Sequence, residues 1–280
     1  MQEELNQFID RALAEDIREG DHTSLACIPA DAVGKAKLLV KEKGVLAGME
    51  LAQLIFKKVD ERIEMTPLLK EGDAIVVGDI AFTVVGPSGA LLTAERLVLN
   101  CMQRMSGIAT KTQQIVQLLA GTKAQVLDTR KTTPGIRLLE KWAVKIGGGS
   151  NHRFGLYDMM MIKDNHIDFT GGIKQAITKA NAYQKTNGLS LKIEVEARDL
   201  AEVKEILSVG NIHRIMLDNF SFENTRAAVA LINGEYETEA SGGITEATIR
   251  QHAECGVDYI SVGALTHSVS SLDLSLKAVE

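Results

Sequence analysis

The sequence predicts an α/β protein with two parts: a small domain built on a sheet with helices, and a larger, incomplete (β/α) barrel. After Gly121, short apolar runs end in polar residues six times, and helical patterns separate them. Successive run ends lie 22 to 35 residues apart, which is the spacing of βα units and predicts a parallel sheet. Six units are fewer than the eight of a closed barrel. An open doubly wound sheet is the alternative.

The first part shows mixed helix and strand patterns. Apolar residues at helical spacing predict helices over 3–14 and Met49–Val59, and a long helix over 91–119 that Ser106-Gly107 weakens or kinks. Residues 20–24 are predicted as a turn. Strands are expected over 33–46, 63–69 and 74–85, with Gly72-Asp73 as a hairpin-type turn between the last two.

The second part alternates strand and helix. Its strands are predicted to end just before or at Asp128, Lys163, Glu196, Asp218, Ser241 and Gly263, and its helices to cover 137–146, 173–185, 200–207, 222–232 and 246–254. The tail 271–280 alternates Leu272, Leu274 and Leu276 with polar residues. This pattern predicts a strand with one buried face, which we expect to return to the first sheet.

Composition restricts the class of protein. Aromatic residues are 4% of the 280, so the core should be aliphatic, and the net charge of −6 argues against general nucleic-acid binding. The N-terminus is acidic, unlike a signal peptide, and the most apolar stretch, 74–85, is too short for a membrane span. Three widely spaced cysteines, Cys27, Cys101 and Cys255, are expected to be buried and reduced. We therefore expect a cytoplasmic protein without nucleic-acid or membrane partners.

Residues 128–166 form a positive island in this acidic chain. They contain seven Lys or Arg and only four Asp or Glu, with Pro134 and a triple-glycine run placing loops between the cations. Such loops offer positive charge and backbone N–H groups. The island is a solvated surface or, as we favour, a site for phosphates and carboxylates.

Arg104 lies on the polar face of the predicted long helix and has no carboxylate three or four residues away. It is either a solvated arginine or one directed at an anion beyond its own helix.

Strand ends carry the other candidate chemistry. Glu194 and Glu196 should point to one side of their strand, where they either form salt bridges with nearby lysines or, for Glu196 together with Asp218, hold Mg²⁺ directly or through water. Glycine turns follow the last two strands, at Ser241-Gly242-Gly243 and Val262-Gly263-Ala264, where barrels often bind phosphate.

Histidines outside the positive island give weaker signals. His22, His213 and His252 are expected to be structural or at the surface, and His267 is a candidate substrate contact. No catalytic triad, Walker loop or dinucleotide fingerprint is visible. Catalysis would therefore rest on positioning and electrostatic stabilisation.

Ordered motifs along nearly the whole chain resemble the quinolinate phosphoribosyltransferase family of NAD biosynthesis. They are EDIREGDHTS (15–24), ERLVLNCMQRMSGIAT (95–110), DTRKTTPG (128–135), GGGSNHRFGLYDMMMIKDNH (147–166), IEVEARDL (193–200), MLDNF (216–220), EASGGIT (239–245) and ISVGALTH (260–267). The resemblance implies an N-terminal α/β sandwich domain (1–109 with 270–280) and an incomplete α/β barrel of about six units (110–269). It also implies a homodimer in which Arg104 is supplied across the interface.

The resemblance also implies roles for individual residues. It places Thr129, Arg130, Lys131, His152, Arg153 and Lys163 around quinolinate and phosphoribosyl pyrophosphate. Glu196 and Asp218 would lie near the ribose and Mg²⁺, and Ser241, Gly242, Gly243, Val262, Gly263 and Ala264 would hold the 5-phosphate with His267 close by. Lys131, Lys163, Glu196 and Asp218 would act in catalysis.

The implied reaction joins the quinolinate nitrogen to the ribose, releases pyrophosphate and loses CO₂ to give nicotinate mononucleotide. Two alternatives remain open: a related phosphoribosyltransferase with another substrate, and a phosphosugar-binding sensor without turnover.

Overall fold

A computed structural model describes residues 2–279, which divide into two compact units. The first unit contains residues 2–113, 132–148 and 264–279, and the second contains 114–131 and 149–263. The domain ranges expected above stay a prediction, since compactness alone does not define a domain. Among the described residues, no helix is long and apolar enough to cross a membrane.

A four-stranded sheet with the order β12-β1-β5-β3 is the centre of the first unit, and β2 pairs with β4 beside it. The strands are β1 (Val33–Val40), β2 (Gly44–Val45), β3 (Glu64–Pro67), β4 (Ala74–Ile75), β5 (Ile80–Pro87) and β12 (Leu274–Val279). The helices are α1 (Gln2–Ile17), α2 (His22–Cys27), α3 (Met49–Val59), α4 (Ser88–Leu118, with its last turn in the second unit), α5 (Arg137–Ile146) and α11 (Ala264–His267).

Turn chemistry explains where the strand predictions for this unit are wrong. The stretch 74–85 is not one strand, because Gly78 at a φ of +101° and Asp79 turn the chain between β4 and β5. Gly72 does turn the chain, with a φ of +83°, but β3 pairs with β5 and β4 pairs with β2, so no hairpin forms there. The predicted turn at 20–24 runs into α2, because the Asp21 carboxylate accepts from the Ser24 N–H at 3.0 Å and caps that helix.

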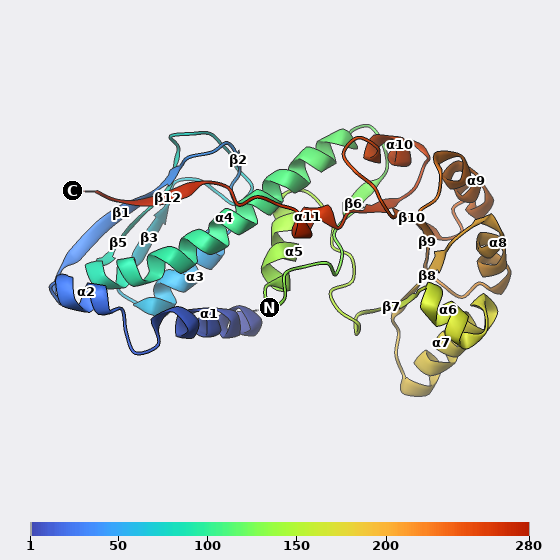
Figure 1. Ribbon diagram of the computed structural model, residues 1–280, viewed down its shortest axis with the longest axis horizontal. Coiled ribbons are helices and arrows are strands. Elements are labelled where there is room, and N and C mark those ends of the chain that lie inside the picture. The colour runs from blue at the N-terminus through green and yellow to red at the C-terminus, as the bar shows by residue number, and fades with distance from the viewer. Residues whose placement is uncertain (1, 280) are drawn as a thin grey trace. The chain divides into compact units, whose positions relative to one another are not determined.

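The core of the first unit is packed by α3 and α4. Phe56 of α3 meets Phe82 of β5 edge to face, with ring centroids 5.9 Å apart. α4 continues through Ser106-Gly107 without a break (Figure 1), so the expected weak point does not interrupt the helix. Gly107 instead allows the tail to approach, since a Cβ there would overlap the carbonyl oxygen of Ser270.

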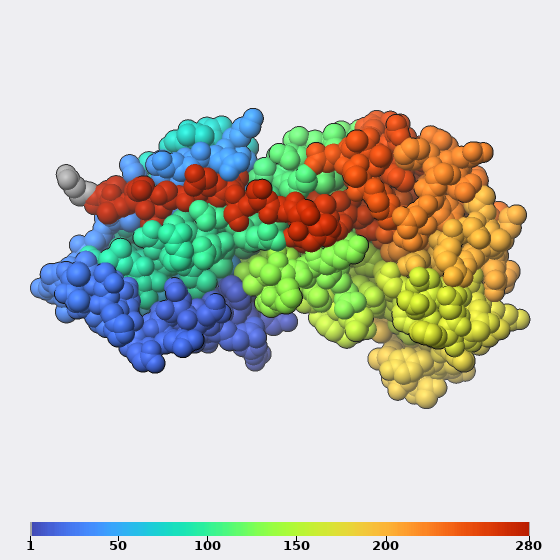
Figure 2. Space-filling view, in the orientation of Figure 1, coloured from blue at the N-terminus to red at the C-terminus, as the bar shows by residue number. Residues whose placement is uncertain are grey.

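The C-terminal strand returns to the first sheet, as predicted. β12 pairs antiparallel with β1 from Lys35↔Val279 to Val40↔Leu274. Leu274 and Leu276 are buried, and Figure 2 shows the red C-terminal segment lying along the blue N-terminal segments of this unit. Each buried leucine contributes roughly 1.5–3 kcal/mol to folding.

Six parallel strands form the second unit, in the order β6-β11-β10-β9-β8-β7. The strands are β6 (Gln125–Leu127), β7 (Met159–Ile162), β8 (Lys192–Ala197), β9 (Arg214–Asp218), β10 (Glu237–Ser241) and β11 (Tyr259–Ser261). The helices are α6 (Asp164–Thr170), α7 (Ile173–Asn187), α8 (Leu200–Val209), α9 (Phe222–Ile232) and α10 (Ile249–Glu254).

This strand order confirms the incomplete barrel. From β7 to β11 each strand pairs with the next strand along the chain, and β6 follows β11, so β6 and β7 are the two free edges. The alternative of an open doubly wound sheet is wrong, because such a sheet reverses its strand order at a switch point and this one does not. Helix α6 was not predicted, since it follows β7 directly as a short segment.

The two faces of this sheet differ in polarity. One face carries buried apolar residues such as Ile193, Val195 and Ile215, while the alternate positions carry charges such as Glu194 and Glu239. Both faces are therefore buried, but only one is apolar. The charged face is the interior of the incomplete barrel.

The cysteine prediction is correct in part. Cys101 and Cys255 are buried and all three cysteines are free, but Cys27 at the end of α2 is exposed.

Candidate active site

The loop segment at Ser150 pairs with the edge of β6 that no strand covers. Ser150 bridges Leu127 in parallel fashion, its N–H donates to Val126 at 2.9 Å, and its carbonyl accepts from the Asp128 N–H at 3.1 Å. The buried Asp128 carboxylate then accepts the His152 N–H at 2.9 Å. Two of the glycines that precede this segment have local reasons: a Cβ on Gly147 would overlap the Ala109 carbonyl oxygen, and Gly148 has a φ of +87°.

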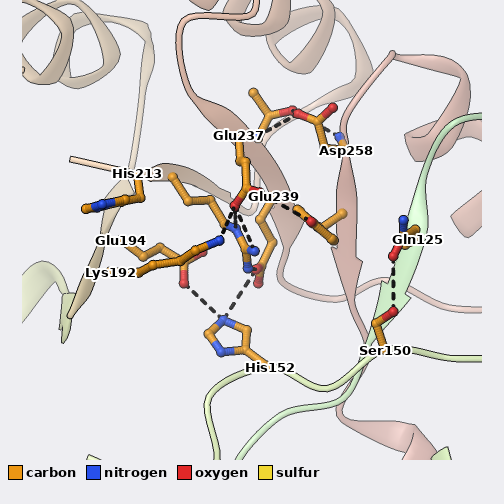
Figure 3. A network of polar contacts seen from close by, with 12 residues as sticks. Gln125, Ser150, His152, Lys192, Glu194, His213, Glu237, Glu239 and Asp258 are labelled. Carbon is orange, nitrogen blue, oxygen red and sulfur yellow. Dashed lines mark hydrogen bonds and ion pairs between the residues drawn. The ribbon is translucent and has the colours of Figure 1, made fainter. Parts of the chain in front are cut away.

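His152 thereby lies in the interior, with 8% of its surface exposed. Its Nε2 atom is 3.0 Å from Glu194 and 3.3 Å from Glu239 (Figure 3). Both carboxylates are fully buried. The predicted position of Glu194 and Glu196 on one side of β8 is correct, but Glu194 contacts a histidine rather than a lysine.

Two effects oppose each other on the His152 ring. Burial lowers the pKa of His152, but the charges of Glu194 and Glu239 oppose this effect and raise the pKa above its usual range. However, Nδ1 accepts the Arg153 N–H at 2.6 Å, which requires Nδ1 to be unprotonated. The geometry therefore defines a ring that carries its proton on Nε2, and full protonation of the ring must first open the contact with Arg153.

Other charged residues also contact these carboxylates. Arg214, the first residue of β9, donates to Glu239 at 3.0 Å and to Glu237 at 3.1 Å, and its guanidinium lies 4.1 Å from the centre of the Tyr259 ring. Burial, followed by the charge of Glu239, raises the pKa of Glu194 to about 7. The interior is thus a network of compensating charges, none of which was predicted beyond Glu194 and His152.

The Arg153 side chain carries a positive charge beside this network. Burial and then the charge of Arg130 lower the pKa of Arg153, so Arg130 acts on it electrostatically. Arg153 donates to the Met159 carbonyl at 3.2 Å, and the Asp158 carboxylate fixes the intervening loop by accepting the Phe154 and Gly155 N–H groups. Two neighbouring guanidinium groups attract a dianion better than a monoanion.

A pocket of about 410 Å³ opens at this segment. It is lined by Asn151, His152, Arg153, Phe154, Asp158, Met159, Lys192 and Arg214. Lys192 and Arg214 are the first residues of β8 and β9, so this pocket lies at the amino ends of the strands, opposite the carboxyl ends that carry Glu196 and Asp218. Neither residue was predicted.

The carboxyl ends of β7, β8 and β9 bring together three predicted residues. Lys163 donates to Glu196 at 2.8 Å, so the salt-bridge alternative describes this pair. Asp218 lies nearby, and burial followed by the charge of Glu196 raises its pKa above the usual range. Two carboxylates share this mouth, and adding positive charge there would relieve their repulsion.

The next strand end forms a tight backbone turn. Asn219, at a φ of +55°, donates its N–H to the Ser241 carbonyl and its side-chain amide to Asp218, both at 2.8 Å. Gly242 has a φ of +92°, and a Cβ on it would lie 2.5 Å from Cγ of Asn219. Asn219 was missed by sequence reasoning, although an Asn directly after a strand is a known signal for positive φ.

The remaining predicted residues in the second unit have local roles in the structure. The Thr129 hydroxyl accepts the N–H of Lys131, whose side chain is exposed, at 3.0 Å. The buried Val262 donates its N–H to Leu127 at 2.9 Å and ties β11 to β6. Gly263 ends this unit.

Three predicted site residues belong to the first unit: Arg104, Ala264 and His267. Arg104 donates to the buried Glu140 of α5 at 2.7 Å and to the carbonyls of Thr266 and Val269. Arg104 is therefore directed at an anion beyond its own helix, as expected, and this anion is Glu140 of the same chain. It keeps 24% of its side chain exposed and lines a pocket of about 330 Å³. His267 is exposed, with Nδ1 2.7 Å from the Ser268 hydroxyl.

Comparisons with known proteins agree along nearly the whole chain. Residues 21–106 match the family described as quinolinate phosphoribosyl transferase, N-terminal domain, and residues 108–277 match its C-terminal domain. Quinolinate phosphoribosyltransferase (decarboxylating) 1b of Nicotiana tabacum is 46% identical over 289 residues, covering 98% of this chain and 82% of the relative.

Solved structures show the same fold. The crystal structure of NadC from Streptococcus pyogenes has a TM-score of 0.93 at 39% identity and covers 100% of this chain and 99% of its own. The nicotinate-nucleotide pyrophosphorylase of Francisella tularensis has a TM-score of 0.91 at 36% identity, covering 100% and 97%.

Proposed function

Because the chain belongs to the quinolinate phosphoribosyltransferase family, we propose that it transfers the phosphoribosyl group of phosphoribosyl pyrophosphate to quinolinate. The ring nitrogen would attack C1 of the ribose, pyrophosphate would leave, and CO₂ would be lost, giving nicotinate mononucleotide for NAD biosynthesis. The observation that carries this proposal is the mouth in which Lys163 donates to Glu196 beside Asp218, in the same unit as Arg130 and Arg153.

The arginine pair suits the dicarboxylate. Arg130 and Arg153 sense each other's charge, and each can donate two parallel hydrogen bonds to one carboxylate. Quinolinate has two adjacent carboxylates, so a dianion would relieve the repulsion between the guanidinium groups. Nicotinate, with one carboxylate, would leave part of that repulsion in place.

The mouth suits the transfer step. As pyrophosphate leaves, positive charge develops on the ribose, and the carboxylates of Glu196 and Asp218 can stabilise it. Lys163, now paired with Glu196, and the exposed Lys131 carry the charge that offsets the leaving group. The turns at Ser241–Gly243 and 262–264 would present N–H groups to the 5-phosphate.

The residues at this mouth also fit Mg²⁺. Glu196 and Asp218 offer carboxylate oxygens, the ligands that Mg²⁺ prefers, and the charge of Glu196 close to Asp218 supports a cation between them. We propose that these two carboxylates would hold the ion, directly or through water. Bound there, it would supply charge neutralisation of the pyrophosphate oxygens.

Decarboxylation needs little from the protein beyond orientation. After transfer the ring nitrogen is cationic, so it stabilises the electron pair that stays on C2 when the bond to the 2-carboxylate breaks. CO₂ leaves, and C2 then takes a proton from solvent. Arg130 and Arg153 would hold the remaining carboxylate so that the ring does not tumble.

We further propose a homodimer with Arg104 supplied across the interface, and a cytoplasmic location. The partly exposed Arg104 beside a pocket supports the first, and three free cysteines support the second.

A direct assay tests the proposed function. The purified protein is incubated with phosphoribosyl pyrophosphate, Mg²⁺ and carboxyl-labelled quinolinate, and nicotinate mononucleotide, pyrophosphate and CO₂ are measured. We expect the three in equal amounts, with little turnover of nicotinate. Preferred turnover of nicotinate or another base would indicate a different phosphoribosyltransferase, and binding without pyrophosphate release would indicate a sensor.

A further inference from the structure

The buried network of charged residues around His152 has no part in the bond-making steps just described, yet it places several ionisable groups in contact inside the barrel. Two glutamates are fully buried, and their charges meet one histidine and one arginine: Glu194, Glu239, His152 and Arg214. Burying four ionisable groups costs free energy unless each is compensated by a partner. Such an arrangement needs a reason beyond filling a barrel, because aliphatic side chains would fill it at lower cost.

Both ring nitrogens of His152 make polar contacts, and these contacts indicate what the buried charges do. Nε2 faces Glu194 at 3.0 Å and Glu239 at 3.3 Å, while Nδ1 accepts the backbone N–H of Arg153 at 2.6 Å. The His152 N–H is fixed in turn by Asp128. The ring therefore lies between the buried carboxylates and the peptide that carries Arg153.

We propose that Glu194 and Glu239, with Arg214 bound to Glu239, are positioning residues that hold His152 in its Nε2-protonated form and thereby orient Arg153 toward the quinolinate carboxylates. This inference rests on the proposed function for its substrate. It assigns a role in substrate binding to buried residues that act through His152.

Charge and geometry favour this role over a metal site. The three atoms of His152, Glu194 and Glu239 lie close enough together to hold an ion. However, Arg214 already donates to Glu239 at 3.0 Å, and the guanidinium brings to the site the positive charge that an ion would otherwise supply.

The chain provides a matched control in Glu237. It lies two residues before Glu239 on β10 and also binds Arg214, at 3.1 Å, but it is partly exposed and makes no contact with His152. Glu237→Gln therefore removes a carboxylate that binds Arg214 but keeps both carboxylates that face the His152 ring.

The first measurement uses the unaltered protein. Histidine labelled with ¹⁵N reports by NMR which ring nitrogen carries the proton, and the chain has only six histidines, so His152→Gln identifies the signal. We expect an Nε2 proton that exchanges slowly and an unprotonated Nδ1. A ring protonated on Nδ1, or one that loses the Nε2 proton to stoichiometric Zn²⁺, would overturn the proposal.

The second measurement compares Glu194→Gln, Glu239→Gln and Glu237→Gln by calorimetry and kinetics. We expect the first two to shift the His152 signal, to weaken quinolinate binding by roughly 10- to 100-fold, and to leave the KM for phosphoribosyl pyrophosphate nearly unchanged, because a misplaced guanidinium affects one substrate only. Glu237→Gln should do none of these.

Unchanged quinolinate affinity in both Gln variants, or an equal loss for both substrates, would refute the positioning role. If the unaltered protein neither binds nor turns over quinolinate, the proposed function fails instead, while the NMR result still decides the state of the ring.

Discussion

At the scale of single residues, the turn after β10 depends on the absence of one side chain. Gly242 combines a φ of +92° with an approach to Asn219 that leaves no room for a Cβ, while Gly243 has a φ of +61° and open space around it. An alanine at Gly242 would therefore meet both backbone strain and a steric clash, whereas an alanine at Gly243 would meet the strain alone.

We expect Gly242→Ala to lower the free energy of unfolding by at least about 2 kcal/mol, and Gly243→Ala by about 1 kcal/mol, since only the first adds a clash to the strain. Urea denaturation measures both. The Gly242 variant should also lose affinity for phosphoribosyl pyrophosphate. Equal costs for the two variants would show that Asn219 moves aside freely.

The carboxylate mouth leads to a prediction about the metal. A chelator should abolish turnover and added Mg²⁺ should restore it, while the circular dichroism spectrum stays constant, because Glu196 is already paired with Lys163 and the fold does not depend on an ion. Asp218→Asn should raise the Mg²⁺ concentration needed for half-maximal activity. Unfolding on chelation would contradict this expectation.

At the scale of elements, α4 contains two glycines with opposite surroundings. A Cβ on Gly107 would overlap the Ser270 carbonyl, whereas Gly89 has only the Ser24 Cβ, at 4.0 Å. Both lie in one helix, where alanine is favoured over glycine by up to about 1 kcal/mol.

We therefore expect Gly89→Ala to leave the melting temperature unchanged or raise it, and Gly107→Ala to lower it by several degrees. The added methyl group would push away the segment that leads into β12. Thermal denaturation followed by circular dichroism compares the variants. A Gly107 variant as stable as the Gly89 variant would mean that the 270 segment yields without cost.

Most elements could be predicted from the sequence because their patterns are local. Apolar periodicity placed α3, α5 and α9 at their observed bounds, and the spacing of strand ends gave the parallel sheet. The division between β4 and β5 could not be predicted, because the apolar run continues up to the turn at Gly78. There, backbone conformation overrides the pattern.

The candidate site was predictable where topology decides it. Lys163, Glu196 and Asp218 end adjacent parallel strands, so any parallel sheet with this order brings them together. The partners of His152 were not predictable, because a loop delivers its ring through the contact with Asp128 and no local pattern encodes that path.

At the scale of the whole molecule, variants of Arg104 test whether each active site is complete within one subunit or is shared between two. Arg104→Ala would leave the buried Glu140 without its guanidinium, which costs about 3–5 kcal/mol. Arg104→Lys keeps a charge while removing the forked donor, so it is the better variant for an activity test.

We expect Arg104→Lys and Lys131→Ala to be weakly active alone and to recover activity when mixed. In a mixed dimer one site would carry both changes and the other neither, so random exchange should restore up to about a quarter of the unaltered activity. Lack of recovery, with exchange demonstrated by mass spectrometry, would place Arg104 in the site of its own subunit.

The pairing of β12 with β1 also affects how the chain is made. Ribosomes release the protein from its N-terminus, so β1 emerges early, but its partner β12 follows only after the whole second unit. Until β12 is made, β1 presents an unpaired edge, and such edges are templates for aggregation. The first sheet can therefore be completed only after the second unit has been synthesised, and the yield of folded protein depends on how that edge is shielded until then.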